Sequence, residues 1–102
     1  MTDEKRIQNA IISYLASLVH SGHPLYYERR QAGGFSYKKG QADLWACYNG
    51  KHIEIEVKRI GGQQSSMQEK WEKRCELNNI PYICVSSVDE VKTAFLIYFG
   101  VK

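Results

Sequence analysis

The strongest constraint on the fold is the Asn49-Gly50 dipeptide, which separates the apolar segment 44–48 from the segment 52–58, where apolar and polar residues alternate. Asn-Gly favours a two-residue type I′ turn, because both central positions of that turn need positive φ angles. The backbone twist of this turn matches the twist of the antiparallel strands that flank it. The pattern therefore predicts a β-hairpin of strands 44–48 and 52–58 joined at this dipeptide.

The turn also determines which residues of the hairpin face each other. With the dipeptide in the turn, Tyr48 pairs with Lys51. Continued along both strands, this register places Asp43 opposite Glu56. Directly opposed residues have Cβ atoms ~4.5–5.5 Å apart, so two carboxylates placed there repel each other. A divalent cation would offset this repulsion, since Mg²⁺ is bound by carboxylates, phosphates and waters. The alternatives are a proton on one carboxylate or the ammonium group of Lys58.

Residue alternation along 53–58 divides the second strand of the hairpin into an apolar face and a charged face. The apolar face holds Ile53, Ile55 and Val57, and the charged face holds Glu54, Glu56 and Lys58. A charged face is commonly solvated in a hairpin. Here a predicted helix follows the strand, which places the strand inside the sheet, where helices cover at least one face. We therefore interpret the charged face as a candidate site, with a solvated face as the alternative.

The remaining segments complete an α/β pattern. Apolar residues at spacings of three and four predict a helix over 3–20, with Thr2 as its N-cap. The further elements are strand 24–30, a Gly-rich polar loop 31–42, helix 66–77, strand 81–86 and helix 88–98. The order αβββαβα predicts one domain, residues 1–102, built as an α/β sandwich around a mixed four-stranded sheet flanked by helices.

Finer expectations concern individual side chains. Ser66 and Glu69 have the spacing of a capping box at the start of helix 66–77. The apolar run 81–86 predicts a strand buried on both faces. The last helix should face inward with Val91, Ala94, Phe95 and Tyr98. Three widely spaced cysteines predict buried free thiols rather than disulfides or a zinc site, and these are Cys47, Cys75 and Cys84.

Composition limits the class of protein. The 102 residues are 43% hydrophobic and 25% charged, as in an ordinary globular domain. No apolar run of about 18 residues is present, so we expect no membrane span. The charged N-terminal segment lacks the apolar core of a signal peptide, so we expect a cytoplasmic protein. The net charge of +3 permits a phosphate-bearing partner without establishing one.

Two more polar residues are candidates for the same region. Glu4 lies near the centre of the apolar stripe of helix 3–20, so its carboxylate should face the sheet. Stabilisation by the positive end of the helix dipole is the alternative explanation for Glu4. Gln68 lies in the first turn of helix 66–77, on the same side as Trp71. It is either a polar core residue or a side chain that reaches the site.

These residues, in this order and spacing, resemble a PD-(D/E)XK nuclease. The matching segments are Gly40-Gln-Ala-Asp43-Leu, Ile55-Glu56-Val57-Lys58-Arg59 with Gly61-Gly62, Ser65-Ser-Met-Gln68 with Trp71, the early Glu4, and Arg30-Gln-Ala-Gly33-Gly34. Within that superfamily the chain is most similar to the virus-type replication–repair nuclease (VRR-NUC) domain, over nearly its whole length. Ala42 departs from the pattern, because the superfamily name expects proline before Asp43.

The resemblance implies a restriction-endonuclease-like fold and metal-dependent hydrolysis of DNA phosphodiester bonds. The implied ligands of Mg²⁺ or Mn²⁺ are Asp43, Glu56, the Val57 carbonyl and Glu4, the last directly or through water. Lys58 would orient or activate the attacking water and neutralise developing charge. Gln68 would position Lys58 or the phosphate. The implied catalytic residues are therefore Asp43, Glu56, Lys58, Gln68 and Glu4.

The implied substrate is branched DNA such as a Holliday junction, cut by a homodimer in the cytoplasm of a bacterium or a phage-infected host. Candidate contacts to DNA phosphates are Arg29, Arg30, Lys38, Lys39 and Arg59. An ordinary solvated surface is the alternative for each of these five. The alternative functions are a nuclease with flap, nicking or sequence-specific preference, and a non-catalytic DNA-binding domain. A membrane partner is not expected.

Overall fold

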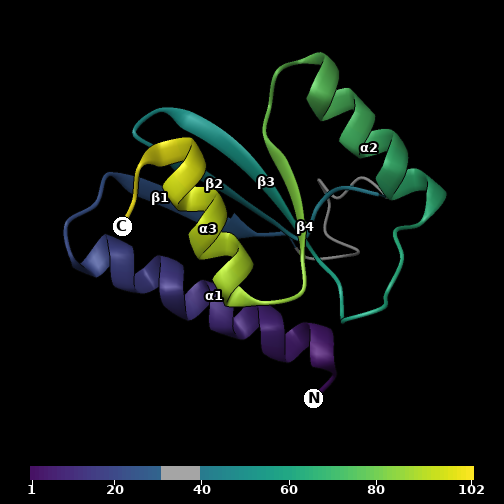
Figure 1. Ribbon diagram of the computed structural model, residues 1–102, viewed down its shortest axis with the longest axis horizontal. Coiled ribbons are helices and arrows are strands. Elements are labelled where there is room, and N and C mark those ends of the chain that lie inside the picture. The colour runs from purple at the N-terminus through teal and green to yellow at the C-terminus, as the bar shows by residue number, and fades with distance from the viewer. Residues whose placement is uncertain (31–39) are drawn as a thin grey trace.

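The computed structural model of the chain describes residues 1–30 and 40–102. Its elements, in chain order, are α1 (Asp3–His20), β1 (Leu25–Arg29), β2 (Leu44–Tyr48), β3 (Lys51–Val57), α2 (Ser66–Leu77), β4 (Tyr82–Val85) and α3 (Val88–Phe99) (Figure 1). The order αβββαβα is the predicted one, and each boundary lies within one or two residues of its prediction. Most of the predicted loop 31–42 lies outside the described residues.

The strands form one four-stranded sheet in the order β1-β2-β3-β4. β2 is antiparallel to both β1 and β3, and β4 runs parallel to β3, so the sheet is mixed as predicted. Tyr48 pairs with Lys51, and the pairing continues to Leu44 with Ile55, which confirms the predicted register. Both turn residues have positive φ angles, 50° and 84°, as a type I′ turn requires.

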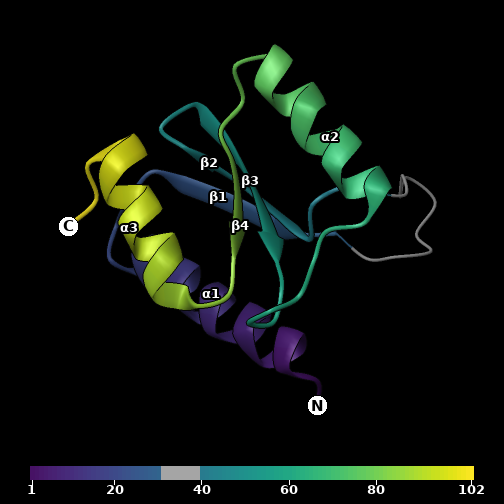
Figure 2. The same cartoon turned by 45° about the vertical axis from the view of Figure 1, so that its right-hand side comes forward.

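Helices cover the two faces of the sheet unequally (Figure 1, Figure 2). α1 and α3 pack against each other on one face, and α2 lies on the other face beside β4. The apolar core lies between the sheet and the α1–α3 pair, and its largest fully buried members are Phe95, Ile11, Leu15, Leu44, Ile53 and Ile55. Because successive strand residues point to opposite faces, Glu54 and Glu56 of β3 point toward α2.

α1 follows from its sequence pattern. The Thr2 side chain accepts a hydrogen bond from the Lys5 N–H at 3.2 Å, so Thr2 is the N-cap as predicted. Ile11, Leu15 and Leu18 are the buried residues of the helix, one or two turns apart. Burial of this stripe against the sheet stabilises α1, since most of the stability of helices in proteins comes from tertiary packing of an amphipathic face. Within the described residues, no helix is both long and apolar enough to cross a membrane.

α2 begins at Ser66 as predicted, but its capping box differs from the prediction by one residue. Ser65 rather than Ser66 is the N-cap, and its partner in the capping box is Gln68 rather than Glu69. The Ser65 hydroxyl accepts from the Gln68 N–H at 3.2 Å, and the Gln68 Oε1 accepts from the Ser65 N–H at 2.8 Å. The amide group of Gln68 is thereby held in one orientation.

Two burial predictions near the C-terminus are wrong. β4 is not buried on both faces, because it is an edge strand, and Cys84 on it is exposed. Tyr98 is 44% exposed, whereas Val91, Ala94 and Phe95 are buried as predicted. All three cysteines are free thiols as predicted, but only Cys75 is buried, and Cys47 is half-buried.

Candidate active site

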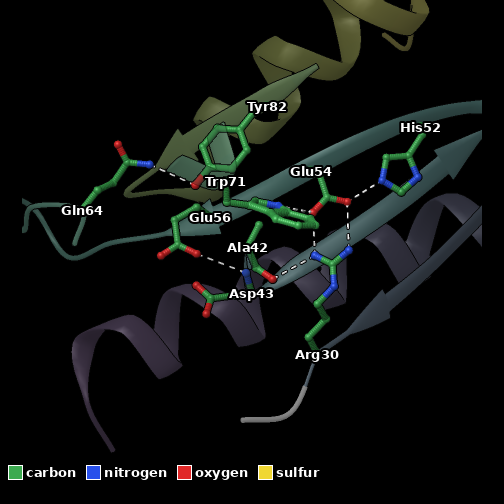
Figure 3. Close-up of polar contacts among 9 residues, drawn as sticks. All are labelled: Arg30, Ala42, Asp43, His52, Glu54, Glu56, Gln64, Trp71 and Tyr82. Carbon is green, nitrogen blue, oxygen red and sulfur yellow. Dashed lines mark hydrogen bonds and ion pairs between the residues drawn. The ribbon is translucent and has the colours of Figure 1, made fainter. Parts of the chain in front are cut away.

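Asp43 and Glu56 meet where β2 begins and β3 ends. The Asp43 N–H donates to the Glu56 Oε1 at 3.2 Å, and the Val57 N–H donates to the Asp43 Oδ2 at 2.9 Å. Figure 3 shows the two carboxylates side by side, on the same side of the hairpin. The hairpin register thus places these two side chains together, as the turn at its other end predicted.

Gly40 determines how the chain enters the site. Its φ is +92°, a conformation that favours glycine, and a Cβ atom at this position would lie 2.6 Å from the Met67 carbonyl oxygen at the start of α2. A side chain is therefore excluded by both the backbone conformation and the close approach. The contact brings the segment that precedes Asp43 against the first turn of α2, which carries Gln68.

Lys58 and Gln68 both approach the Glu56 carboxylate. The Lys58 Nζ lies 3.5 Å from the Glu56 Oε2, and the Gln68 Nε2 donates to the same oxygen at 2.5 Å. The Lys58 side chain is 17% exposed, so it lines the opening of the site to solvent. Because the Gln68 oxygen is engaged in the helix cap, its NH₂ group faces Glu56. The Gln68 side chain therefore reaches the Glu56 carboxylate, which is the second of the two predicted alternatives.

Burial makes the charged forms of both carboxylates unfavourable. Loss of solvent, followed by the charge of Asp43, raises the pKa of Glu56 from 4.5 to about 7, against the lowering effect of Lys58. Loss of solvent also raises the pKa of Asp43, the hydrogen bond from the Val57 N–H lowers it, and the charge of Glu4 raises it slightly. Two carboxylates therefore share a site in which a positive charge would relieve both desolvation and repulsion.

This donor set suits a hard divalent cation. Mg²⁺ is commonly bound by one or two carboxylates, with substrate phosphates and waters completing its coordination, and Asp43 and Glu56 supply two. Across residues 1–30 and 40–102, no group of three or more His, Cys, Asp and Glu side chains is close enough to hold a metal ion. Glu4 is thus not in a three-carboxylate cluster, although it is close enough for its charge to act on Asp43.

A second polar cluster, which we call the Glu54 cluster, consists of Glu54, Arg30, His52 and Trp71 (Figure 3). Sequence reasoning assigned Glu54 no role, although alternation placed it on the same face as Glu56. Glu54 is 2% exposed and is bound by all three partners. His52 is two positions from Glu54 on β3, but Arg30 and Trp71 come from the end of β1 and from α2, so local spacing could not have identified those two partners.

The predicted phosphate contacts occupy different environments. Arg29 and Arg59 are exposed, whereas Lys38 and Lys39 lie outside the described residues. Arg30 is different, because both of its terminal nitrogens bind Glu54. The predicted role of Arg30 as a phosphate contact therefore does not fit its structural environment.

Comparison with known proteins identifies the fold. No family model matches the sequence, and no curated protein matches it. A solved structure described as "VRR_NUC domain" is similar over 97% of this chain and 99% of that chain, with a TM-score of 0.74 and 18% sequence identity. The α/β chain with its mixed four-stranded sheet therefore has the fold of a VRR-NUC nuclease domain, as the sequence predicted.

Proposed function

We propose that this protein is a divalent-metal-dependent endonuclease that hydrolyses phosphodiester bonds in DNA. The observation that carries the proposal is the meeting of Asp43 and Glu56 at one end of the hairpin, with Lys58 3.5 Å from the Glu56 carboxylate. The likeness of the fold to a VRR_NUC domain supports this choice among the possible functions of a carboxylate pair.

Each residue of the site would have a distinct role in hydrolysis. Asp43 and Glu56 would hold Mg²⁺ or Mn²⁺ together with the Val57 carbonyl, and Glu4 would assist directly or through water. When bound, the cation polarises the scissile phosphate and lowers the pKa of a water molecule. Lys58 would orient that water and neutralise negative charge that develops on the phosphate. Gln68 fixes the orientation of the Glu56 carboxylate through its 2.5 Å hydrogen bond.

The finer proposal concerns the substrate. We propose that the enzyme prefers branched DNA such as a Holliday junction and acts as a homodimer, which presents one active site to each of two opposed strands. The exposed Arg29 and Arg59 and the net charge of +3 support contact with a phosphate backbone.

Cleavage assays on four-way junction, flap and linear duplex DNA, each with Mg²⁺, Mn²⁺ or EDTA, test both levels of the proposal. We expect cleavage with either metal, fastest on the junction, and none in EDTA. Equal rates on all three substrates would contradict the preference for branched DNA. DNA binding without cleavage under any condition would indicate a non-catalytic binding domain. Light scattering that shows a monomer at micromolar concentration would contradict the homodimer.

Substitutions test the assigned roles. We expect Asp43→Ala and Lys58→Ala each to reduce the cleavage rate by roughly a thousandfold or more, while DNA affinity changes by less than about threefold, because neither side chain is needed to hold the substrate in place. Lys51→Ala is the matched control for Lys58→Ala, since Lys51 is an exposed lysine at the other end of β3. Wild-type turnover by either active-site variant would refute the catalytic roles of Asp43 and Lys58.

A further inference from the structure

Glu54 is a second buried carboxylate on the face of β3 that carries Glu56. Its Oε1 accepts from the Arg30 Nη1 at 2.6 Å and from the Trp71 Nε1 at 3.2 Å. Its Oε2 accepts from the Arg30 Nη2 at 3.0 Å and also contacts the His52 Nε2. Both oxygens are therefore fully engaged by protein groups, so Glu54 has a role distinct from metal binding.

Arg30 connects this carboxylate to the backbone around Asp43. Its Nη1 also donates to the Ala42 carbonyl at 3.0 Å, and its own backbone N–H donates to the Asp43 carbonyl at 2.8 Å. The carbonyls immediately before and after the Asp43 Cα atom are thus both bound by the same arginine. Figure 3 shows the guanidinium between the Glu54 carboxylate and this segment of backbone.

The geometry requires an arginine in particular. A guanidinium presents several N–H groups in a fixed plane, so it can bind a carboxylate with two nitrogens and still donate to a carbonyl. The Arg30 plane also packs against the Trp71 ring, with its central carbon 5.9 Å from the ring centroid. An ammonium group is a point charge on a flexible stem and cannot reproduce this set of contacts.

Trp71 extends the same arrangement to α2. Trp71 donates to Glu54, and Gln68, one turn earlier on the helix, donates to Glu56. Glu54 and Glu56 lie two residues apart on the same face of β3, so α2 is bound to this face of the strand at two points. The Glu54 cluster thus borders the site on two sides, at the backbone of Asp43 and at the helix that carries Gln68.

We infer that Arg30, held by Glu54, is a positioning residue that sets the Asp43 carboxylate against Glu56, and that it does not bind DNA phosphate. A buried ion pair of this kind contributes little net stability compared with apolar residues, so a role in specifying geometry accounts better for its presence. The importance of this positioning for catalysis rests on the proposed nuclease function. The positioning itself does not, because it concerns contacts within the protein.

The test compares Arg30→Lys and Glu54→Gln with the wild type and with Arg74→Lys. Arg74 is the matched control, because it is an exposed arginine on α2 that the site does not use. The first readout needs neither metal nor DNA. The Val57 N–H donates to the Asp43 carboxylate, so its amide hydrogen exchange reports the position of that carboxylate. We expect exchange at Val57 to accelerate about tenfold in both Arg30→Lys and Glu54→Gln, while Ile55 in the middle of β3 is unchanged.

Two further readouts separate positioning from DNA binding. We expect Mn²⁺ affinity, measured by calorimetry without DNA, and the cleavage rate to fall about 10- to 100-fold in Arg30→Lys, as for loss of a group that orients a metal ligand. DNA affinity in EDTA should stay within about twofold of the wild type. Arg74→Lys should leave exchange at Val57, Mn²⁺ affinity and the cleavage rate unchanged.

Three results would overturn the inference. Weaker DNA binding by Arg30→Lys, with a salt dependence reduced by about one phosphate contact and unchanged Val57 exchange, would make Arg30 a phosphate ligand. Equally faster amide exchange at all residues of β3 would show that Arg30 only stabilises the fold in general. If Arg30→Lys had the Val57 exchange rate and the Mn²⁺ affinity of the wild type, the positioning role would also be refuted. If the wild type neither bound Mn²⁺ nor cut DNA while Val57 exchange changed selectively, the nuclease proposal would fail and the positioning of Asp43 would stand.

Discussion

Replacement of Glu56 by glutamine should change the pH dependence of stability in a direction that few substitutions produce. Burial and the neighbouring Asp43 raise the pKa of Glu56 from 4.5 to about 7 in the folded protein. Between these two values the folded protein binds a proton that the unfolded chain has released. The free energy of unfolding of the metal-free wild type should therefore decrease as the pH rises from about 5 to about 8.

The size of this effect follows from the shift in pKa. Each unit corresponds to ~1.36 kcal/mol, so the full shift corresponds to about 3 kcal/mol. Solvent screening at the open end of the site reduces this to roughly 2 kcal/mol. The Glu56→Gln variant lacks the titration, so this contribution is absent from its pH profile.

The Glu56→Gln substitution also lowers the free energy of unfolding by an amount that does not depend on pH. Glu56 accepts hydrogen bonds from the Asp43 N–H through Oε1 and from Gln68 through Oε2, and an amide supplies only one acceptor oxygen. The loss of one such bond costs about 1 kcal/mol at any pH. Glu56→Gln should therefore be less stable than the wild type by about 1 kcal/mol at pH 5 and more stable by a similar amount at pH 8.

Urea denaturation in EDTA, followed by tryptophan fluorescence at pH 5, 6, 7 and 8, measures this difference. In a parallel series at pH 8, Mg²⁺ at about 100 times its dissociation constant should stabilise the wild type by about 2.7 kcal/mol and leave the variant unchanged. Parallel pH profiles of the two proteins in EDTA would refute the reasoning, because they would show that the buried charge of Glu56 carries no penalty.

Two further predictions concern residues outside the carboxylate pair. Gly40→Ala should lower the free energy of unfolding by roughly 2 kcal/mol or more, because its φ is +92° and the new Cβ would lie 2.6 Å from the Met67 carbonyl oxygen. The control Gly50→Ala, with φ +84° and no atom within 4 Å of the new Cβ, should lower it by about 1 kcal/mol. Equal losses of stability in urea denaturation would contradict the role of the close approach. Desolvation raises the pKa of Cys84 as well, but its side chain is exposed, so in the native protein at pH 8 a thiol reagent should modify Cys84 faster than Cys75. The buried Cys75, whose pKa burial raises to about 11, should react only after unfolding. Mass spectrometry of the labelled peptides measures both rates, and labelling of Cys75 as fast as Cys84 would contradict the assigned burial.

Much of the fold could be predicted from the sequence because its signals are local. Asn49-Gly50 determined the hairpin turn, and the turn determined the register that brings Asp43 opposite Glu56. Period-two alternation separated the apolar face of β3 from the face that carries Glu54 and Glu56. These signals act between residues that are close in the chain or are linked by one tight turn, so no tertiary information was needed.

Tertiary structure decided which polar side chains meet. The sequence placed Arg30 among the phosphate contacts, but the fold buries its guanidinium against Glu54, 24 positions away. The N-cap of α2 is Ser65 rather than the predicted Ser66. The Gln68 oxygen is therefore engaged in the cap, and the NH₂ group of Gln68 is directed to Glu56. The free energy of an ionisable group depends on burial and on the charges around it, and both are set by residues that become neighbours only when the sheet and helices assemble.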